Sequence, residues 1–227
     1  MGDEEFDIPP ECRGFDEENL GKRLEVAKEF VVAFASKAVP SMSVDEKNKE
    51  WTKSVRRCLK VICTSECYMC PPDPERSKGE FLVDFSWAEI KFPQRILLAG
   101  ESEWGTDKFG EKRWDRVEED FEKLLSIKAP FKVLIFPSNW NIGDSESARD
   151  RDFSIGFAKQ KLKGSLEGYG HHLAGEVYIF IDFPEGGDKN GPGVYRSFIW
   201  LVKKSGDAGE VSFENGPNGT LSRPIKT

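Results

Sequence analysis

The sequence predicts an α/β protein in which a mixed β-sheet is flanked by helices. In residues Phe81 to Trp87, apolar side chains alternate with others, as expected for a strand with two different faces. Residues Phe131 to Phe136 are almost wholly apolar, which is typical of a central strand covered on both faces. Before and between these strands, apolar residues recur with the period of amphipathic helices.

Two amphipathic helices are expected in the N-terminal part, where they would form a hairpin against the sheet. The apolar stripe of the first helix consists of Leu20, Leu24, Ala27, Val31, Phe34 and Ala38. This helix is expected to end before Pro40. The second helix is expected to start at the capping box formed by Ser43 and Glu46. Its buried stripe consists of Trp51, Val55, Cys58 and Ile62.

The rest of the chain predicts a crossover unit followed by a hairpin. A strand opens at Arg95, and an amphipathic helix from Asp115 carries the chain across to the apolar strand described above. A weaker helical pattern covers Phe153 to Leu166. The segments Val177 to Phe183 and Tyr195 to Val202 are expected to pair as a β-hairpin with a long tip.

Length and composition favour one folded domain with extensions. A chain of 227 residues, of which 38% are hydrophobic, can bury one sizeable core. Residues 1–15 form an acidic leader that is expected to pack little and to be mobile. Residues 16–227 are expected to form the domain, with a helical hairpin (16–64), a core (79–204) and a tail (205–227).

The charge and the scarcity of histidine limit the function classes. The formal net charge of −7 arises from residues 1–19, which hold eight acidic residues and one basic residue, so the rest of the chain is neutral and can present a basic face. No apolar run approaches the roughly 20 residues that span a bilayer, and the N-terminus lacks the pattern of a secretory signal. We therefore expect a cytoplasmic protein without a membrane partner. The chain has only two histidines, and this scarcity argues against catalytic mechanisms that depend on histidine.

Four of the five cysteines lie close together in the sequence. Cys58, Cys63, Cys67 and Cys70 have the spacing C-x4-C-x3-C-x2-C. A structural zinc ion is one interpretation. The spacing is irregular, however, and Cys58 lies on the apolar stripe of the second helix, so we expect reduced, metal-free cysteines.

Three carboxylates are expected to converge where two neighbouring strands meet. Asp84 interrupts the first strand, while Glu101 and Glu103 share one face of the second at about 6.6 to 7 Å along the backbone. Burying carboxylates is costly unless they are paired or bind a cation. Hard oxygen ligands without nearby histidine select Mg²⁺ or Mn²⁺. The pattern therefore predicts a divalent-metal site whose ion would act on a phosphate group.

At these residues the chain resembles the restriction-endonuclease-like superfamily, the PD-(D/E)XK nucleases. The segments VDFSW, AGESEWG, RVEEDFEKLL and FKVLIF follow the order of that family's hairpin, crossover helix and next strand, over about residues 80–136. The resemblance implies a restriction-endonuclease-like fold and Mg²⁺- or Mn²⁺-dependent hydrolysis of nucleic acid, with DNA as the favoured substrate. It implies that Asp84 and Glu101 are metal ligands, that the Ser102 carbonyl is a further one, and that Glu103 is the third catalytic residue.

The resemblance has one departure, and two alternatives stay open. Glu103 stands where most of the family has lysine, although a minority branch has glutamate there. The missing cation would then come from Lys108, Lys112 or Arg113. One alternative is a non-catalytic member of the same fold that acts as a regulatory or protein-interaction module. The other is that Glu101 and Glu103 face solvent and form ion pairs with lysines on neighbouring strands.

Two tryptophans flank the expected site. Trp104 and Trp114 would either stack on bases or belong to the core, and the core is the favoured interpretation. The sequence does not determine the oligomeric state, and a homodimer is one of the possible states.

Overall fold

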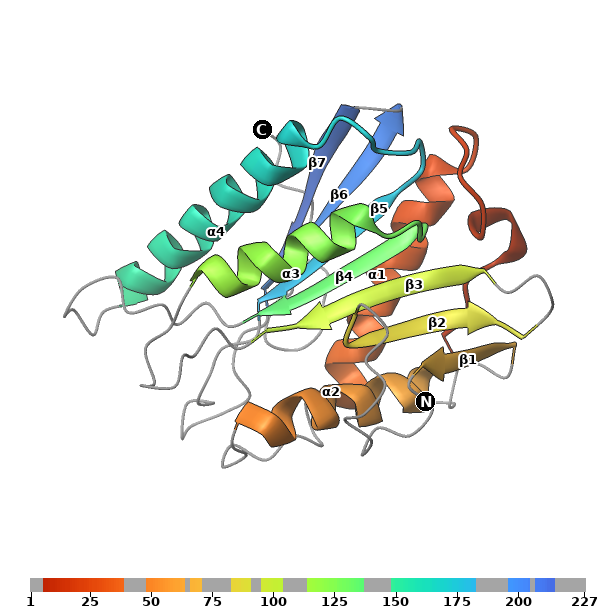
Figure 1. Cartoon of the computed structure of the whole chain (residues 1–227), viewed down its shortest axis with the longest axis horizontal. Coiled ribbons are helices and arrows are strands. Elements are labelled where there is room, and N and C mark those ends of the chain that lie inside the picture. Colours follow the sequence, from red (N-terminus) through yellow and green to blue (C-terminus); the bar gives the residue numbers. More distant parts are fainter. Residues whose placement is uncertain are drawn as a thin grey trace.

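A seven-stranded mixed sheet lies between two layers of helices (Figure 1). The structure is a computed structural model that describes residues 6–38, 48–63, 66–70, 83–90, 95–103, 114–136, 148–182, 196–204 and 207–214. The expected α/β class, with a mixed sheet flanked by helices, is confirmed.

The strands lie across the sheet in the order of the chain. They are β1 (Cys67–Cys70), β2 (Phe85–Glu89), β3 (Ile96–Ser102), β4 (Phe131–Phe136), β5 (Val177–Asp182), β6 (Arg196–Lys204) and β7 (Asp207–Glu214). Strands β3, β4 and β5 are parallel neighbours, and the other neighbouring pairs are antiparallel. The two parallel connections are made by α3 (Trp114–Ser126) and α4 (Ala148–Gly168), which cover one face of the sheet (Figure 1).

The opposite face is covered by α1 (Leu20–Ala38) and α2 (Asn48–Ile62), which pack on each other as the expected helical hairpin. Helix α1 ends before Pro40, as its sequence predicts. The capping box expected at Ser43 and Glu46 lies outside the described residues. A short 3-10 helix, Pro10–Cys12, precedes α1.

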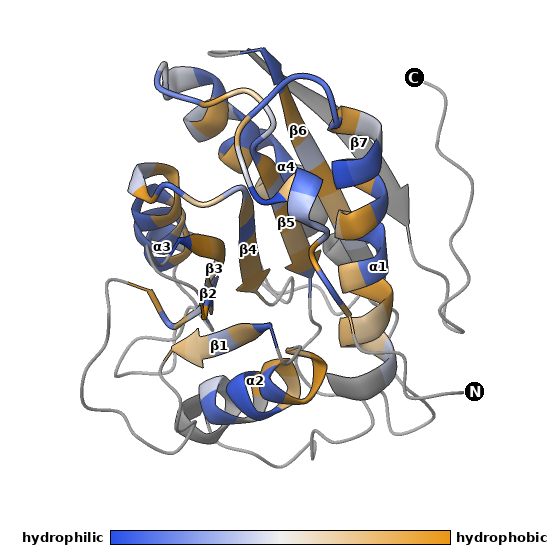
Figure 2. Ribbon diagram, turned by 90° about the vertical axis from the view of Figure 1, so that its right-hand side faces the viewer, coloured by the Kyte–Doolittle hydropathy of each residue, from blue (hydrophilic) through white to orange (hydrophobic). Residues whose placement is uncertain are grey.

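Each face of the sheet has its own hydrophobic core. On the α1 side, Phe30 packs edge-on against Trp87 with ring centroids 5.8 Å apart. On the α3 side, Phe121 packs against Phe180 at 5.3 Å. The central strands β4 and β5 supply side chains to both cores, so they are mainly hydrophobic along their length (Figure 2). This explains the apolar run of β4 in the sequence.

A ring lying on a glycine fixes the register of the β2–β3 hairpin. Phe85 pairs with Gly100, and a Cβ atom at position 100 would lie only 2.0 Å from Cζ of Phe85. Glycine is therefore required where the ring covers the neighbouring strand. Asp84 directly precedes Phe85 and Glu101 directly follows Gly100, so this contact also brings Asp84 and Glu101 next to each other.

The described part of the acidic leader, residues 6–15, contributes buried side chains to the core on the α1 side, which its charge did not predict. Phe6, Ile8 and Cys12 are buried in the core on the α1 side. The ring of Phe6 packs against Phe30 and Trp87, with centroids 5.5 and 5.7 Å away. These apolar residues are too few to show a periodic pattern, and their burial depends on partners far away in the sequence.

Strand bounds also differ from the expected ones. Strand β2 covers Phe85–Glu89, whereas the sequence pattern placed it at Phe81 to Trp87, and Asp84 lies in a bend just before it. Strand β1 was not expected, because four residues are too short for an alternating pattern. The tail contributes β7, an edge strand of eight residues. Among the described residues, no helix combines the length and the hydropathy that a membrane span requires.

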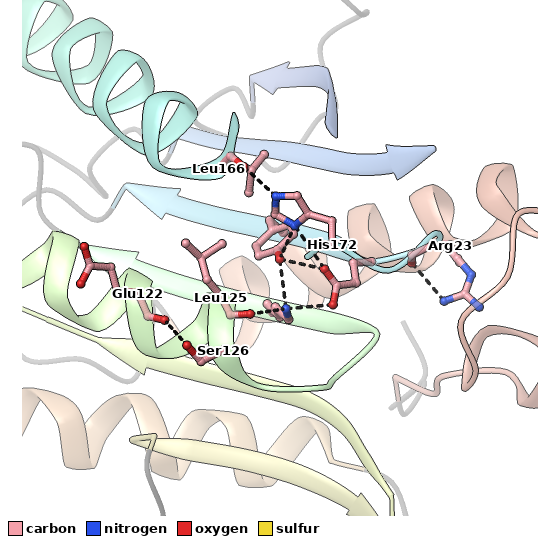
Figure 3. Close-up of polar contacts among 10 residues, drawn as sticks. Arg23, Glu122, Leu125, Ser126, Leu166 and His172 are labelled. Atoms are coloured by element: carbon pink, nitrogen blue, oxygen red, sulfur yellow. Dashed lines mark hydrogen bonds and ion pairs between the residues drawn. The ribbon is translucent and has the colours of Figure 1, made fainter. Parts of the chain in front are cut away.

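Buried polar side chains tie α3 to the sheet at the edge where β4 and β5 begin (Figure 3). The Lys132 Nζ group donates to Glu176 Oε1 at 3.0 Å, to Tyr178 Oη at 3.0 Å and to the Leu125 carbonyl of α3 at 3.4 Å. The Tyr178 hydroxyl donates to the other carboxylate oxygen of Glu176 at 2.9 Å. All three ammonium protons therefore have an acceptor.

His172 extends this network to α4. Its Nε2 donates to the Leu166 carbonyl at 2.6 Å, and its Nδ1 lies 3.1 Å from Tyr178 Oη. Carbonyls in the last turn of a helix lack partners within the helix, so Lys132 and His172 satisfy one such group in each crossover helix. Burial alone would raise the pKa of Glu176, but the bonds from His172 and Lys132 lower it. We call Lys132, His172, Glu176 and Tyr178 the lysine network.

Candidate metal centre

The carboxyl ends of the three parallel strands meet at one edge of the sheet. Strand β3 ends at Ser102, β4 at Phe136 and β5 at Asp182, and the three strands pair in register there. Helices α3 and α4 begin at this edge, because each follows a strand that ends there (Figure 1). Ligands of open α/β sheets bind outside the carboxyl ends of the strands. This edge is therefore the place where a site is expected.

Asp84 and Glu101 come together at this edge. The Asp84 N–H group donates to Glu101 Oε2 at 3.2 Å, and the Ser102 N–H group donates to Asp84 Oδ2 at 2.9 Å. Ser102 thus meets Asp84 through its N–H group. The role of its carbonyl as a metal ligand stays a prediction. The two carboxylates that strand order singled out are neighbours in the folded chain.

Helix α3 adds two residues that the sequence did not single out. The Lys123 ammonium donates to Asp120 Oδ1 and lies 3.8 Å from Glu101 Oε1. The two residues are three positions apart, so both face the sheet from the same side of the helix. Asp120 is buried, while 49% of the Lys123 side chain is exposed. Lys123 therefore contacts the buried carboxyls while part of its side chain reaches solvent.

Helix α2 adds a guanidinium group from the other side. The Arg56 Nε group donates to the Asp84 carbonyl at 2.8 Å, and Nη2 donates to Asp84 Oδ1 at 3.2 Å. We call Asp84, Glu101 and Asp120, together with the cations Arg56 and Lys123, the carboxylate cluster. It draws its members from the β2–β3 hairpin and from helices on both faces of the sheet.

The electrostatics of the carboxylate cluster centre on Glu101, which is 3% exposed. Burial, and then the charges of Asp84 and Asp120, raise its pKa to about 9, against the opposing effect of Lys123. These effects favour the protonated form of the Glu101 carboxyl in the absence of a bound cation. Its Oε1 atom is buried and accepts no hydrogen bond from any described residue.

The carboxylate cluster fits Mg²⁺ or Mn²⁺ through two of its members. Within the described part of the chain, no three His, Cys, Asp or Glu side chains form a ready set of metal ligands. Mg²⁺, however, is commonly held by one or two carboxylates, with water and substrate phosphates completing the shell. Asp84 and Glu101 are two neighbouring carboxylates of this kind, and Glu101 Oε1 has no hydrogen-bond partner among the described residues. Hard carboxylate oxygens favour these ions over zinc.

The third predicted residue, Glu103, lies just beyond the end of β3 and is partly buried. Its N–H group donates to the Ile135 carbonyl of β4 at 3.1 Å. The residues that we expected to supply a cation, Lys108, Lys112 and Arg113, lie outside the described residues, as does Trp104. The described lysine beside Glu101 is Lys123, 22 positions further along the chain.

Trp114 belongs to the core beside the site. It packs edge-on against Phe136 at 6.2 Å and against Phe157 at 5.7 Å between ring centroids. Packing in the core, rather than stacking on bases, is the role that the sequence favoured for Trp114.

None of the five cysteines is a member of the carboxylate cluster, and none forms a disulfide bond. Cys12, Cys58 and Cys67 are buried. Burial, with a contribution from Cys67, raises the pKa of Cys63 to about 12. A thiol with so high a pKa is a poor nucleophile at neutral pH.

Weak sequence signals existed for the residues that were missed. Asp120 is one of the buried residues of α3, and Lys123 follows it three positions later. Arg56 lies beside Val55, in the buried stripe of α2. Such charges on a buried face predict a partner but do not say which one.

Comparisons with protein-family models, with curated proteins and with solved structures found no significant match to this chain. A function must therefore be argued from the geometry and chemistry of the carboxylate cluster.

Proposed function

We propose that the protein is a metal-dependent nuclease of the restriction-endonuclease-like class, with Mg²⁺ or Mn²⁺ as cofactor and DNA as the favoured substrate. The observation that carries the proposal is the buried Glu101 carboxyl, which lies beside Asp84 and whose Oε1 atom has no hydrogen-bond partner among the described residues. A carboxyl whose pKa is raised by burial and by like charges is a frequent mark of a functional site.

The order of elements around these residues supports the same proposal. Asp84 and Glu101 lie on the β2–β3 hairpin, α3 crosses over, and β4 pairs in parallel with β3. The nuclease family that the sequence resembles has a hairpin, a crossover helix and a further strand in this order. The Phe85–Gly100 contact would hold the two carboxylates in the alignment that a shared ion needs.

Each residue then has a chemical role. Asp84 and Glu101 would hold the ion, which would neutralise the scissile phosphate and lower the pKa of an attacking water. Glu103 would orient that water or accept its proton. Lys123 would provide the positive charge that the family's lysine provides, and would stabilise charge developing on the phosphate. Its exposed side chain, 3.8 Å from Glu101, is suited to that role.

One observation favours a second candidate, a non-catalytic module of the same fold. With Glu101 protonated, the charges of Asp84 and Asp120 are matched by those of Arg56 and Lys123. The carboxylate cluster can therefore persist in the folded protein without an ion, and its presence alone does not require catalysis.

Cleavage assays with a carboxylate variant test the nuclease proposal. Single- and double-stranded DNA and RNA are incubated with the protein in Mg²⁺, Mn²⁺, Ca²⁺ or EDTA, and cleavage is expected in Mg²⁺ or Mn²⁺ alone. Asp84→Asn should lower the rate at least ~100-fold, because it removes a charged ligand of the ion. Asparagine keeps a side-chain acceptor for Arg56 Nη2, which alanine would remove. Glu119→Gln, an exposed change on α3, is the matched control.

A thermal-shift measurement separates the two candidates. A cation that binds the folded state alone must raise the melting temperature, and Mn²⁺ should do so for the wild type and less for Asp84→Asn. Intact substrates at high protein and Mn²⁺ concentrations, without any Mn²⁺-dependent shift, would remove the nuclease proposal and leave the non-catalytic module.

A further inference from the structure

Arg56 of α2 reaches the site from the face of the sheet opposite to α3. Its side chain is buried, although arginine is almost never fully buried unless it is paired. We propose that Arg56 is a positioning residue that holds the Asp84 carboxylate in place for the metal ion. The inference rests on the proposed nuclease function and adds the N-terminal helical hairpin, which the family resemblance does not cover, to the site.

Arg56 is one of the groups that together fix Asp84. Its Nε and Nη2 groups bond to the carbonyl and to Oδ1 of the same residue, at 2.8 and 3.2 Å. The Ser102 N–H group holds Oδ2 at 2.9 Å, and the Asp84 N–H group holds Glu101 at 3.2 Å. These bonds fix both the backbone and the carboxylate of Asp84. The side chain therefore loses its rotational freedom before any ion arrives.

The chemistry of the contact calls for arginine. The guanidinium group is planar and presents donors in a fixed fork, so it can bond to a carbonyl and a carboxylate oxygen at the same time. It also keeps its charge at every relevant pH. A lysine would supply the charge from a single flexible point and would not fix the orientation. Each carboxylate oxygen has two lone pairs, so a bond from Arg56 or Ser102 does not by itself prevent Asp84 from binding a cation.

The neighbouring residue provides a natural control. Arg57 follows Arg56 in α2, yet its side chain is exposed whereas that of Arg56 is buried. Arg57→Gln therefore removes one positive charge from the same helix but keeps the two hydrogen bonds from Arg56 to Asp84. Comparing the two substitutions isolates the geometric role of Arg56 from the general effect of lost positive charge.

The test measures the Mn²⁺ concentration that gives half-maximal cleavage, and separately the rate at saturating Mn²⁺. In Arg56→Gln we expect the half-maximal concentration to rise about 10- to 100-fold, the usual range for losing a group that orients a metal ligand. Arg56→Lys should give a smaller rise, and Arg57→Gln none. A purely structural role would lower the amount of folded enzyme without moving this concentration. If Arg56→Gln does not fold, Arg56→Lys carries the same test.

Amide hydrogen exchange of Ser102 in metal-free protein provides a second readout, because its N–H group is bonded to Asp84. Faster exchange in Arg56→Gln than in Arg57→Gln is expected. If the wild type responds to Mn²⁺ and the Arg56 variants respond at the same concentration, the positioning role is wrong while the nuclease proposal stands. If the wild type neither binds Mn²⁺ nor cuts nucleic acid, the nuclease proposal fails and the positioning role fails with it.

Discussion

The lysine network and the carboxylate cluster lie at opposite edges of one sheet and contain buried charge in opposite ways. In the lysine network, one ammonium group faces one carboxylate, and the three protons of Lys132 Nζ have three acceptors. In the carboxylate cluster, carboxyls lie beside each other and Glu101 Oε1 accepts no hydrogen bond from the described residues. The first arrangement gives the Lys132 ammonium group an acceptor for each proton, while the second leaves Glu101 Oε1 without a hydrogen-bond partner among the described residues.

Access to solvent separates the two regions as well. The four side chains of the lysine network belong to residues that are 3% exposed or less, so a substrate cannot reach them. In the carboxylate cluster, Lys123 is half-exposed and 19% of the Asp84 side chain is exposed. A satisfied, sealed network suits a structural role, and an incompletely satisfied one that reaches the surface suits a functional role. The following predictions are expected to separate the regions.

The largest effect is expected from breaking the lysine network. Lys132→Met should lower the free energy of unfolding by about 3 to 5 kcal/mol, because it leaves the Glu176 carboxylate buried without its cation. Urea unfolding followed by circular dichroism measures the loss. Lys128→Met, an exposed change shortly before β4, should stay within about 0.5 kcal/mol of the wild type.

A second substitution sharpens this result. Combining Lys132→Met with Glu176→Gln should recover part of the stability, since the unpaired charge is then removed as well. Strictly additive losses would mean that the ammonium and the carboxylate do not act as a pair.

The pH dependence of stability should distinguish the carboxylate cluster next. Glu101 has a pKa of about 9 in the folded protein against 4.5 as the ordinary value, so the folded state binds its proton more tightly. Its contribution to stability is full below about pH 4.5 and is lost as pH rises towards 9, with a slope of at most about 1.4 kcal/mol per pH unit. Glu101→Gln removes this loss. The free energy of unfolding of the variant, relative to that of the metal-free wild type, should therefore increase from pH 5 to pH 8.

The measurement is urea unfolding in EDTA at several pH values, with Glu119→Gln as an exposed control. Stability curves of Glu101→Gln and wild type that run parallel over this range would show that Glu101 ionises normally, and the contrast between the two regions would then disappear.

A smaller effect on stability is expected from Lys123→Met, and the cleavage rate is its more specific readout. Losing the charge that the proposed function assigns to the phosphate should lower the cleavage rate about 10- to 100-fold. The melting temperature should also fall, because the buried Asp120 carboxylate loses its ammonium partner, but by less than in Lys132→Met, because the Lys123 side chain is half-exposed. Arg116→Gln, an exposed change in the first turn of α3, serves as the control. Equal rates in the wild type and Lys123→Met would assign the cationic role to another residue.

The smallest effect is expected outside both regions. Arg95 forms a two-point bond with Glu89, at 2.8 and 3.1 Å, but 59% of its side chain is exposed. Arg95→Gln should therefore lower the free energy of unfolding by less than about 1 kcal/mol. A loss as large as that of Lys132→Met would show that burial does not set the scale of these interactions.

Several features of this protein are determined locally and could be predicted from the sequence. Helix α1 ends at Ala38 before a proline, and the apolar residues of α3 face the sheet as their spacing predicts. The apolar run of β4 reflects a strand covered on both faces. Asp84 and Glu101 could be placed together because a hairpin brings consecutive strands into contact. In each case the period or the chain order carries the information.

Other features depended on contacts between distant residues, which only the tertiary structure decides. Arg56 lies 28 positions before Asp84 and Lys123 lies 22 after Glu101, so no local pattern joins them. The burial of Phe6 depends on α1 and β2 in the same way. Periodicity shows which face of an element is buried but not what covers it, because the partner is set by how helices and strands pack in space. For that reason the sequence indicated two carboxylates of the candidate site, and the packing of α2 and α3 decided the charges around them.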